Sequence, residues 1–220
     1  MHNIPSQDDI KCGQAIYTKK SLPLYDLIVT KFSNQFVWQC SRKILINFFK
    51  ENTSTNHLDI GVGTGYFLRK LHLTPGNQRI GLLDLNQNCL DYAKKKLNQF
   101  HPEVYQHDVF EPFTSITKKF DSISLNYVLH CLPGTMLQKA KTFDHIKDVL
   151  NPRGKMFGTT ILGKGTNQNY LAKKLLAIYN SKKIMNNIND DKEILLNELK
   201  NRFSYVELKV IGCVALFIAT

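Results

Sequence analysis

The chain has 220 residues, of which 43% are hydrophobic and 21% are charged, and this suits one globular domain that buries its own core. No stretch of 18 uncharged apolar residues occurs, and Met1–Ile10 lacks the apolar core of a signal peptide, so we expect neither membrane insertion nor secretion by that route. The net charge of +11 comes from dispersed lysines without a nucleic-acid-binding motif, so nucleic acid is not the expected partner.

The first predicted elements are helices in residues 1 to about 52. Apolar residues recur there at helical spacing, from Leu24 to Val37 and again from Ile44 to Phe49. We expect residues 1–52 to form a helical lid or cap ahead of the core.

Residues 56 to about 162 alternate short apolar runs with amphipathic stretches. This alternation predicts a parallel sheet covered by helices on both faces. The expected strands are 57–60, 79–84, 103–106, 120–126 and 154–162. The expected crossover helices are 66–73, 89–100 and 137–150. Asn151-Pro-Arg-Gly should end the last helix, because proline cannot continue one.

The last part of the chain predicts one or two helices, at 170–179 and 191–202, and then two apolar runs, 205–211 and 213–219. Gly212 alone separates these runs, which is too short for a crossover, so they should pair as an antiparallel hairpin. The expected fold class is therefore α/β, doubly wound and Rossmann-like, with a seven-stranded, mostly parallel sheet and a C-terminal antiparallel hairpin. Residues 53–220 would form this core, with 163–190 as a substrate-side insertion.

The sharpest motif is the turn after the first predicted strand, His57-Leu-Asp-Ile-Gly-Val-Gly-Thr-Gly. Its glycines let the backbone approach a ligand closely at the start of a helix. Their spacing is G-x-G-x-G, whereas a turn that cradles a dinucleotide pyrophosphate has G-x-G-x-x-G. Asp59 would repel a pyrophosphate but suits a ligand with a positively charged amino group, so a nicotinamide-dependent dehydrogenase is disfavoured. The alternative for Asp59 is a capping or turn carboxylate.

Two further aspartates follow the next two predicted strands. Asp84 ends the second strand, where a carboxylate can accept hydrogen bonds from both ribose hydroxyls. It could instead cap the next helix, although Asn86 is available for that role. Asp108 follows the third strand, where it could accept a hydrogen bond from an adenine amino group or be a surface turn residue. The ordered set of carboxylates carries more weight than any one of them.

In order and spacing, these motifs resemble those of class I S-adenosylmethionine-dependent methyltransferases. Leu58-Asp-Ile-Gly-Val-Gly-Thr-Gly is similar to their first motif, Leu83-Asp-Leu-Asn to the second and Gln106-His-Asp-Val to the third. The segment 120–133 is similar to the fourth, and Leu150-Asn-Pro-Arg-Gly-Lys to the loop before the fifth strand. The resemblance covers 56–162 and, through the hairpin, the C-terminus. It is greatest to small bacterial members of unassigned substrate.

The resemblance implies a site for S-adenosylmethionine, which becomes S-adenosylhomocysteine. The implied cofactor-binding residues are Tyr17, Asp59, Gly61, Gly63, Gly65, Asp84, Leu85, Asp108, Val109 and Asn126. The glycine turn and Asp59 would line the methionine end, Asp84 the ribose, and Asp108 with Val109 the adenine. Asn126 would approach the methionine part from the other side, and Tyr17 would close over the cofactor.

Methyl transfer is an in-line displacement at a sulfonium, and alignment with exclusion of water can suffice for it. A hydroxyl or thiol acceptor benefits from a general base. His130, four residues past the fourth strand, is the candidate, because ligands enter such sheets on that side. The alternative for His130 is a hydrogen-bonded residue that contacts the cofactor or the core.

The five cysteines are scattered and lack a C-x-x-C spacing, so we expect no metal and a reduced, cytoplasmic protein. The expected acceptor is a small molecule methylated on O, N or S by a monomer or homodimer. Two alternatives stay open: an RNA or protein methyltransferase, motivated by the charge, and a non-catalytic partner protein that binds the cofactor. Asn126-Tyr-Val-Leu stands where enzymes that methylate exocyclic amines carry Asn-Pro-Pro-Tyr, which weakens that substrate class.

Overall fold

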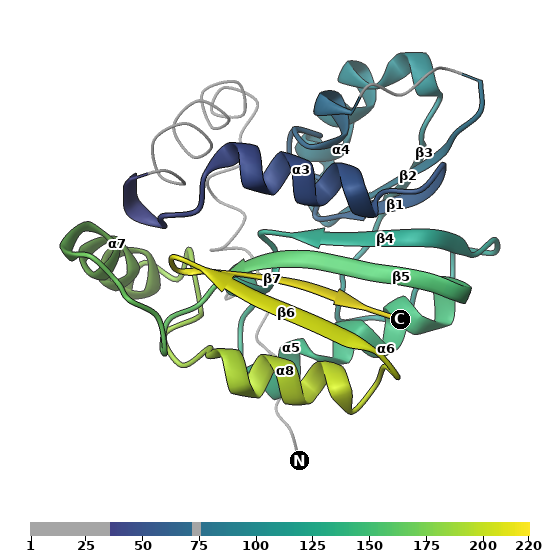
Figure 1. The fold of residues 1–220 in the computed structure, drawn as a ribbon. Helices are drawn as coiled ribbons and strands as arrows, with labels where there is room; N and C mark the ends of the chain where they lie inside the picture. The colour runs from purple at the N-terminus through teal and green to yellow at the C-terminus, as the bar shows by residue number, and fades with distance from the viewer. Residues whose placement is uncertain (1–35, 72–75) are drawn as a thin grey trace.

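The structure is a computed structural model that describes residues 36–71 and 76–220, and their centre is a seven-stranded sheet (Figure 1). The strand order is β3-β2-β1-β4-β5-β7-β6. The strands are β1 (Asn56–Ile60), β2 (Arg79–Asp84), β3 (Glu103–Gln106), β4 (Phe120–Asn126), β5 (Leu150–Ile161), β6 (Val206–Ile211) and β7 (Val214–Ala219). Strands β1 to β5 pair in parallel, and β7 runs antiparallel to β5 and β6. The predicted fold class is confirmed.

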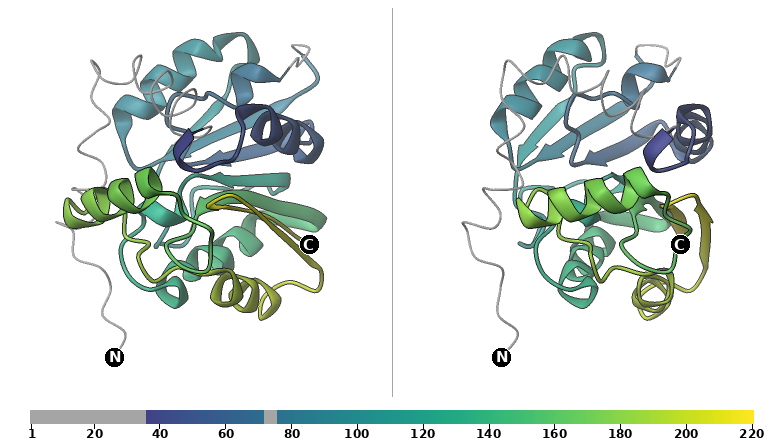
Figure 2. Two further views of the ribbon diagram at one scale, coloured as in Figure 1. Left: turned by 60° about the vertical axis from the view of Figure 1, so that its left-hand side comes forward. Right: turned by 90° about the vertical axis from the view of Figure 1, so that its left-hand side faces the viewer.

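Helices cover both faces of the sheet. On one face lie α3 (Arg42–Asn52) and α4 (Gln87–Lys96) (Figure 1). On the other lie α5 (Met136–Lys139), α6 (Lys141–Val149) and α8 (Lys192–Lys200). The 3₁₀ turns are η2 (Leu68–Lys70), η3 (Asn98–Phe100) and η4 (Leu129–Cys131). Helix α7 (Tyr170–Ser181) lies at the end of the sheet where β4 and β5 finish (Figure 2).

The two faces of the sheet belong to different apolar clusters. Leu58 and Ile123 pack in the cluster that includes residues of α5, α6 and α8. Ile80, Leu82 and Phe157 pack in the cluster that includes residues of α3 and α4. Leu82 and its neighbour Leu83 on β2 pack in these two different clusters, so alternate residues of one strand contact opposite layers, as expected for a sheet buried on both sides. The strand order reverses at β1 and β4, where such sheets open a crevice at their carboxyl ends.

The helix expected at 66–73 is wrong for the described part of that range. Gly65 has φ +69, and the turn continues through Phe67 before a single 3₁₀ turn, η2, after which Leu71 is extended. A left-handed residue cannot lie in a right-handed helix, so the chain stays in a turn through Phe67 and only the short η2 follows. Residues 72–75 lie outside the described residues.

The helix expected at 137–150 forms as two helices, α5 and α6, which meet at Ala140. The Asn151-Pro-Arg-Gly stretch follows α6 as expected, but it lies within β5 as an irregularity. Phe120 pairs with Leu150 and Ser122 with Lys155, so the register between β4 and β5 shifts across it. The expected helices in the last third of the chain are confirmed as α7 and α8, and the hairpin as β6 and β7.

The predicted lid at residues 1–52 can be followed only from residue 36, where α3 confirms its helical second part. Tyr17 lies outside the described residues. The division into a lid, a core and an insertion stays a prediction. Within the part of the chain that the structure describes, no helix combines the length and apolar character needed to cross a membrane.

Candidate functional site

A cavity lies at the carboxyl ends of β1, β2, β3 and β4, where the reversed strand order predicts a ligand site. Its lining residues are Gly61, Gly63, Asp84, Leu85, His107, Asp108, Val109, Phe110, Tyr127, Val128, Cys131, Leu132 and Pro133. The structure thus brings together Gly61, Gly63, Asp84, Leu85, Asp108 and Val109 from the residues predicted to bind the cofactor. Gly65, Asp59, Asn126 and His130 do not line it.

The three glycines of the turn are left-handed but serve different neighbours. A Cβ atom on Gly61 would lie 2.3 Å from Cγ2 of Val128, so glycine lets the loop after β4 approach. A Cβ on Gly65 would meet Leu97 at 3.2 Å, so this glycine lets the turn pack against the helix layer. A Cβ on Gly63 would meet only the carbonyl oxygen of Gly61, at 4.0 Å. Gly63 therefore leaves open space on the cavity side, a cradle that a ligand can approach.

Asp84 connects the glycine turn with the start of α4. Its Oδ2 accepts the N–H of Gly63 at 3.0 Å, and its Oδ1 accepts the N–H of Asn86 at 2.9 Å. Burial raises the pKa of Asp84, while the hydrogen bonds from the N–H groups of Asn86 and Gly63 lower it. Each carboxylate oxygen has two lone pairs, so both can still accept a ligand hydroxyl. Asn86, the residue available for that role, caps α4 by accepting the N–H of Asn88, so Asp84 is not the cap.

The part of the cavity that follows β3 is an apolar slot with one carboxylate. Asp108 follows β3, and its Oδ1 accepts the N–H of Phe110 at 3.0 Å. Val109, Phe110 and Leu132 line the same cavity. A flat, largely apolar ring with an amino donor fits such a slot, because the ring is desolvated while the donor finds an acceptor.

Asp59 lies behind the glycine turn with only 4% of its surface exposed. Its Oδ1 accepts the hydroxyl of Ser124 from β4. Burial raises the pKa of Asp59 to about 7, the hydrogen bond from Ser124 lowers it, and the negative charge of Asp84 raises it further. A carboxyl group in this position gains from a nearby positive charge, which would favour its ionised form.

Asn126 ends β4 directly before Tyr127, which lines the cavity, and is 8% exposed. Its Oδ1 accepts the hydroxyl of Thr159 at 3.1 Å. Its Nδ2 is buried and finds no hydrogen-bond partner within the described residues. Buried donors are rarely left unpaired, so this amide fits a site that receives an acceptor from a ligand.

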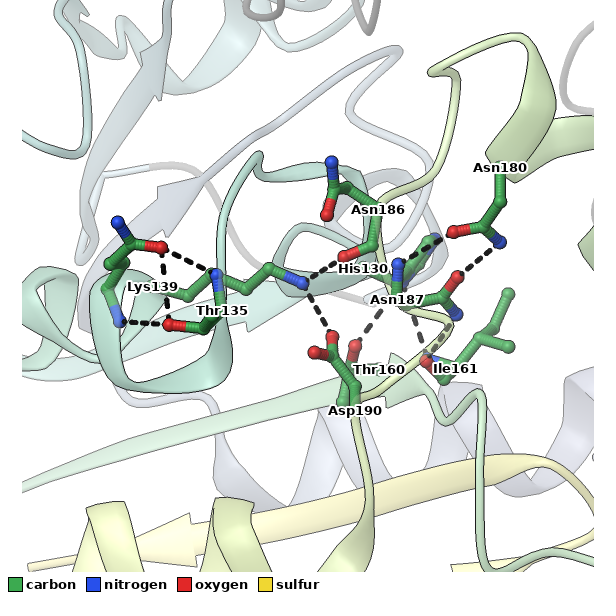
Figure 3. A network of polar contacts seen from close by, with 10 residues as sticks. His130, Thr135, Lys139, Thr160, Ile161, Asn180, Asn186, Asn187 and Asp190 are labelled. Carbon is green, nitrogen blue, oxygen red and sulfur yellow. Dashed lines mark hydrogen bonds and ion pairs between the residues drawn. The ribbon is translucent and has the colours of Figure 1, made fainter. Parts of the chain in front are cut away.

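His130 precedes the cavity-lining Cys131 and is itself only 3% exposed, within the polar network that Figure 3 shows. Its Nδ1 accepts the N–H of Ile161 at 3.3 Å and lies 3.4 Å from Oγ1 of Thr160. Burial and the charge of Lys139 lower the pKa of His130 to about 3, so the ring is neutral near pH 7. Since Nδ1 accepts a hydrogen bond, Nε2 carries the proton of the neutral ring. A general-base role for His130 stays a prediction.

The loop after β4 contributes a wall that the predicted site residues omitted. Tyr127, Val128, Cys131, Leu132 and Pro133 line the cavity. Tyr127 has φ +58, an uncommon conformation for a bulky residue, and its N–H donates to the carbonyl of Thr159 at 2.8 Å. Strained residues of this kind cluster at functional sites. The sequence did hold a signal for this wall, because the segment 120–133, which resembles the fourth motif, includes all of these residues.

Across residues 36–71 and 76–220, no group of three or more His, Cys, Asp or Glu side chains is arranged to hold a metal ion. The chemistry of the cavity is that of hydrogen-bonding carboxylates, an open glycine backbone and apolar walls. Together with the strand order, this is the arrangement with which Rossmann-like proteins bind nucleoside ligands at the sheet edge.

The comparisons with known proteins give the class. Residues 58–156 match the family model described as a methyltransferase domain. Methyltransferase aurB of Calcarisporium arbuscula is 37% identical, with 88% of this chain and 90% of that protein aligned. The physcion biosynthesis cluster O-methyltransferase of Aspergillus chevalieri is 37% identical, with 97% of each chain aligned. In fold, the DhpI–SAH complex has a TM-score of 0.68 at 13% identity and covers 98% of each chain.

The chain belongs to the class I S-adenosylmethionine-dependent methyltransferases. This confirms the family that the order and spacing of its motifs predict, and with it a methyl-transferring enzyme.

Proposed function

We propose that this protein transfers the methyl group of S-adenosylmethionine to a hydroxyl group of a small organic molecule. The cavity at the carboxyl edge of the sheet carries the proposal, because it joins an open glycine turn, ribose- and adenine-type carboxylates and apolar walls. The relative from Aspergillus chevalieri is named as an O-methyltransferase, and similarity over 97% of each chain supports oxygen as the acceptor atom.

The residues present fit this cofactor. Asp84 and Leu85 would hold the ribose, and Asp108 with Val109 the adenine. Gly61 and Gly63, with Asp59 behind them, would hold the methionine end, and the unpaired Nδ2 of Asn126 would donate to its carboxylate. Gly65 acts through packing, and Tyr17 would close over the site. When bound, the cofactor supplies an electrophilic methyl group on a positively charged sulfur.

The chain's own contribution to transfer is alignment and exclusion of water. Tyr127, Val128 and Leu132 form a largely apolar wall on the β4 side of the cavity. Such a wall holds the acceptor in line and keeps water from competing with it. In this geometry His130 has no free lone pair for the acceptor's proton, since Nδ1 accepts from Ile161. The base role therefore needs this hydrogen bond to break, and the pH–rate profile of His130→Ala tests it.

The segment 163–190 is proposed as the substrate-side cover, with residues 1–52 as a cap. Helix α7 carries exposed apolar side chains, including Tyr170 at 77% and Leu171 at 47% exposure, which supports contact with an apolar molecule. The cysteines of the described residues, Cys40, Cys89, Cys131 and Cys213, carry free thiols. That supports work in a reducing compartment, which we propose to be the cytoplasm, as a monomer or homodimer.

Calorimetric titration with S-adenosylmethionine and S-adenosylhomocysteine tests the cofactor. We expect dissociation constants in the micromolar range, and a loss of about tenfold or more in Asp84→Ala, because charged hydrogen-bond acceptors contribute ~1.5–3 kcal/mol. Asp91→Ala, an exposed aspartate on α4, is the matched control and should bind normally. Failure of the wild type to bind either ligand would refute the proposal.

A panel of small phenols, alcohols, amines and thiols then tests the acceptor. Mass spectrometry should find a singly methylated product with the hydroxyl compounds. Methylation confined to amines or thiols would show that nitrogen or sulfur, and not oxygen, is the acceptor atom, and would leave the cofactor assignment unchanged.

A further inference from the structure

A row of polar side chains that ends at Asp59 crosses the face of the sheet that α3 covers. His57 and Asp59 on β1 point to the same side as Ser122 and Ser124 on β4, because the register pairs His57 with Ser122 and Asp59 with Ser124. Exposure is 0% for His57, Ser122 and Ser124 and 4% for Asp59. Buried polar groups cost free energy unless they are hydrogen-bonded, so their contacts show what the row does.

The contacts are continuous from the edge of the core to the site. The hydroxyl of Ser124 donates to Oδ1 of Asp59, and its oxygen lies 3.2 Å from Nε2 of His57. Nδ1 of His57 lies 2.8 Å from Oγ of Ser122. That oxygen accepts the N–H of the half-buried Ser54 at 2.8 Å. The hydroxyl oxygen of Ser54 also lies 2.8 Å from Oγ of Ser122, and its hydrogen donates to the carbonyl of Asn56 at 2.9 Å.

The protonation of His57 sets the direction of this row. Burial lowers the pKa of His57 to about 3, so the ring is neutral and has one donor and one acceptor. With the proton on Nε2, Ser54 donates to Ser122, Ser122 to Nδ1, Nε2 to Ser124, and Ser124 to the carboxylate. All donors then point toward Asp59. Hydrogen bonds aligned head to tail polarise one another, so the last of them is strengthened.

The groups that face this part of β1 come from four elements. Strand β2 contributes Leu82, which pairs with Asp59, and the charge of Asp84. Strand β5 and helix α3 contribute the rings of Phe157 and Phe49, at 5.8 and 5.6 Å from the ring of His57. Strand β4 contributes the serines. The surroundings are thus apolar or negative, and the serine–histidine row is the contact that favours an ionised Asp59.

We propose that Ser122, His57 and Ser124 are positioning residues that favour the ionised form of Asp59 and aim it at the positively charged amino end of the cofactor. The inference rests on the proposed function, since it requires S-adenosylmethionine as the ligand. It gives the row a role in affinity, beyond the satisfaction of a buried histidine.

The consequence is a pH-dependent affinity with a definite sign. A cationic ligand selects the ionised form of Asp59, and the pKa of this group lies at about 7. Affinity for S-adenosylhomocysteine therefore falls about tenfold for each pH unit below that value and levels off above it. The ligand's own amino group also titrates, at alkaline pH. The ratio of wild-type to variant affinity cancels that contribution, because both proteins bind the same ligand.

The test is calorimetric titration of S-adenosylhomocysteine between pH 5.5 and 8 in wild type, Ser124→Ala, His57→Phe and Ser122→Ala. Loss of the direct hydrogen bond in Ser124→Ala should raise the midpoint by about one pH unit, or about tenfold in affinity at low pH. His57→Phe should raise it by roughly half as much, and Ser122→Ala by less. In every case the affinity ratio shrinks toward one as the pH rises.

Two further variants bracket the result. Asp59→Asn should bind weakly with a flat pH profile. Thr142→Val removes a fully buried hydroxyl on α6, outside the row, and should keep the wild-type profile. If His57→Phe fails to fold, the two serine variants carry the test. A variant-to-wild-type ratio that is the same at every pH would reduce the row to a structural role and overturn the inference. Absence of binding in the wild type would instead refute the proposed function.

Discussion

Lys139 and Asp190 form a buried ion pair under the loop that follows α7 (Figure 3). Nζ of Lys139 lies 2.6 Å from Oδ2 of Asp190, and the two side chains are 0% and 3% exposed. Nζ also donates to the carbonyl of Asn186, whose N–H donates to the carbonyl of His130 at 2.7 Å. The pair thus joins α5 and the loop after α7 to the turn behind the cavity wall. Lys139→Met would keep the aliphatic packing and leave Asp190 buried without its counter-charge.

Removal of one partner of a buried pair typically costs about 3–5 kcal/mol, since the remaining charge stays desolvated. Because methionine fills most of the lysine volume, we expect about 3 kcal/mol here. That corresponds to a fall in Tm of roughly 6–12 °C for a domain of this size. Burial raises the pKa of Asp190, and Lys139 now opposes that shift. Without Lys139 the folded pKa rises further, so stability is lost as pH rises through it, and the defect should be larger at pH 8 than at pH 5.

Urea unfolding followed by circular dichroism measures the loss of unfolding free energy in Lys139→Met at pH 5 and at pH 8. Lys139→Met with Asp190→Asn removes both charges and should recover at least half of the loss. Lys192→Met is the control, because its pair with Glu193 is exposed, at 3.8 Å, and such pairs contribute under ~1 kcal/mol. A Lys139→Met variant within ~1 kcal/mol of wild type, or a double variant no better than Lys139→Met, would refute the reasoning.

Two further predictions concern the glycine turn and the effect of acid pH on stability. Gly61→Ala should lose at least tenfold in S-adenosylhomocysteine affinity by titration, because its Cβ would lie 2.3 Å from Val128. Gly76→Ala is the control: Gly76 has φ +105 and open space around it, so alanine there should cost only ~1–2 kcal/mol of unfolding free energy through the backbone. Equal ligand affinity in the two variants would contradict this expectation. Burial lowers the pKa values of His57 and His130 to about 3. The stability that these neutral rings contribute is therefore present above about pH 6.5 and is lost as the pH falls toward 3. Urea midpoints should drop over this range, and a flat profile would show that neither ring stays neutral and buried.

The strands were predictable because each buried strand needs its own apolar run. The runs at 79–84, 103–106 and 120–126 became β2, β3 and β4 with the same bounds. Gly212 required a hairpin, and β6 and β7 form it. The crossover helix after the glycine turn was not predictable from its amphipathic pattern. The left-handed backbone of that turn overrides the pattern, and backbone conformation of this kind depends on what the turn contacts.

Part of the candidate site followed from topology. Asp84 and Asp108 were expected at one edge because parallel strands end together, and both line the cavity with Gly61 and Gly63. Asp59 and His130 could be named as candidates but not placed. Their burial depends on which layers pack over the ends of β1 and β4, and the periodicity of either strand alone does not contain that information.

What the chain alone determines is the order of its chemistry: a glycine turn after one strand, a carboxylate after each of the next two, and a closing hairpin. Period-two alternation also assigns His57 and Asp59 to one face of their strand. Only the tertiary structure decides that β4 lies beside β1 and aligns Ser122 with His57 and Ser124 with Asp59. The reason is physical: strands about 65 positions apart pair through backbone hydrogen bonds that every residue offers equally, so the packing of whole layers selects the partner and the register.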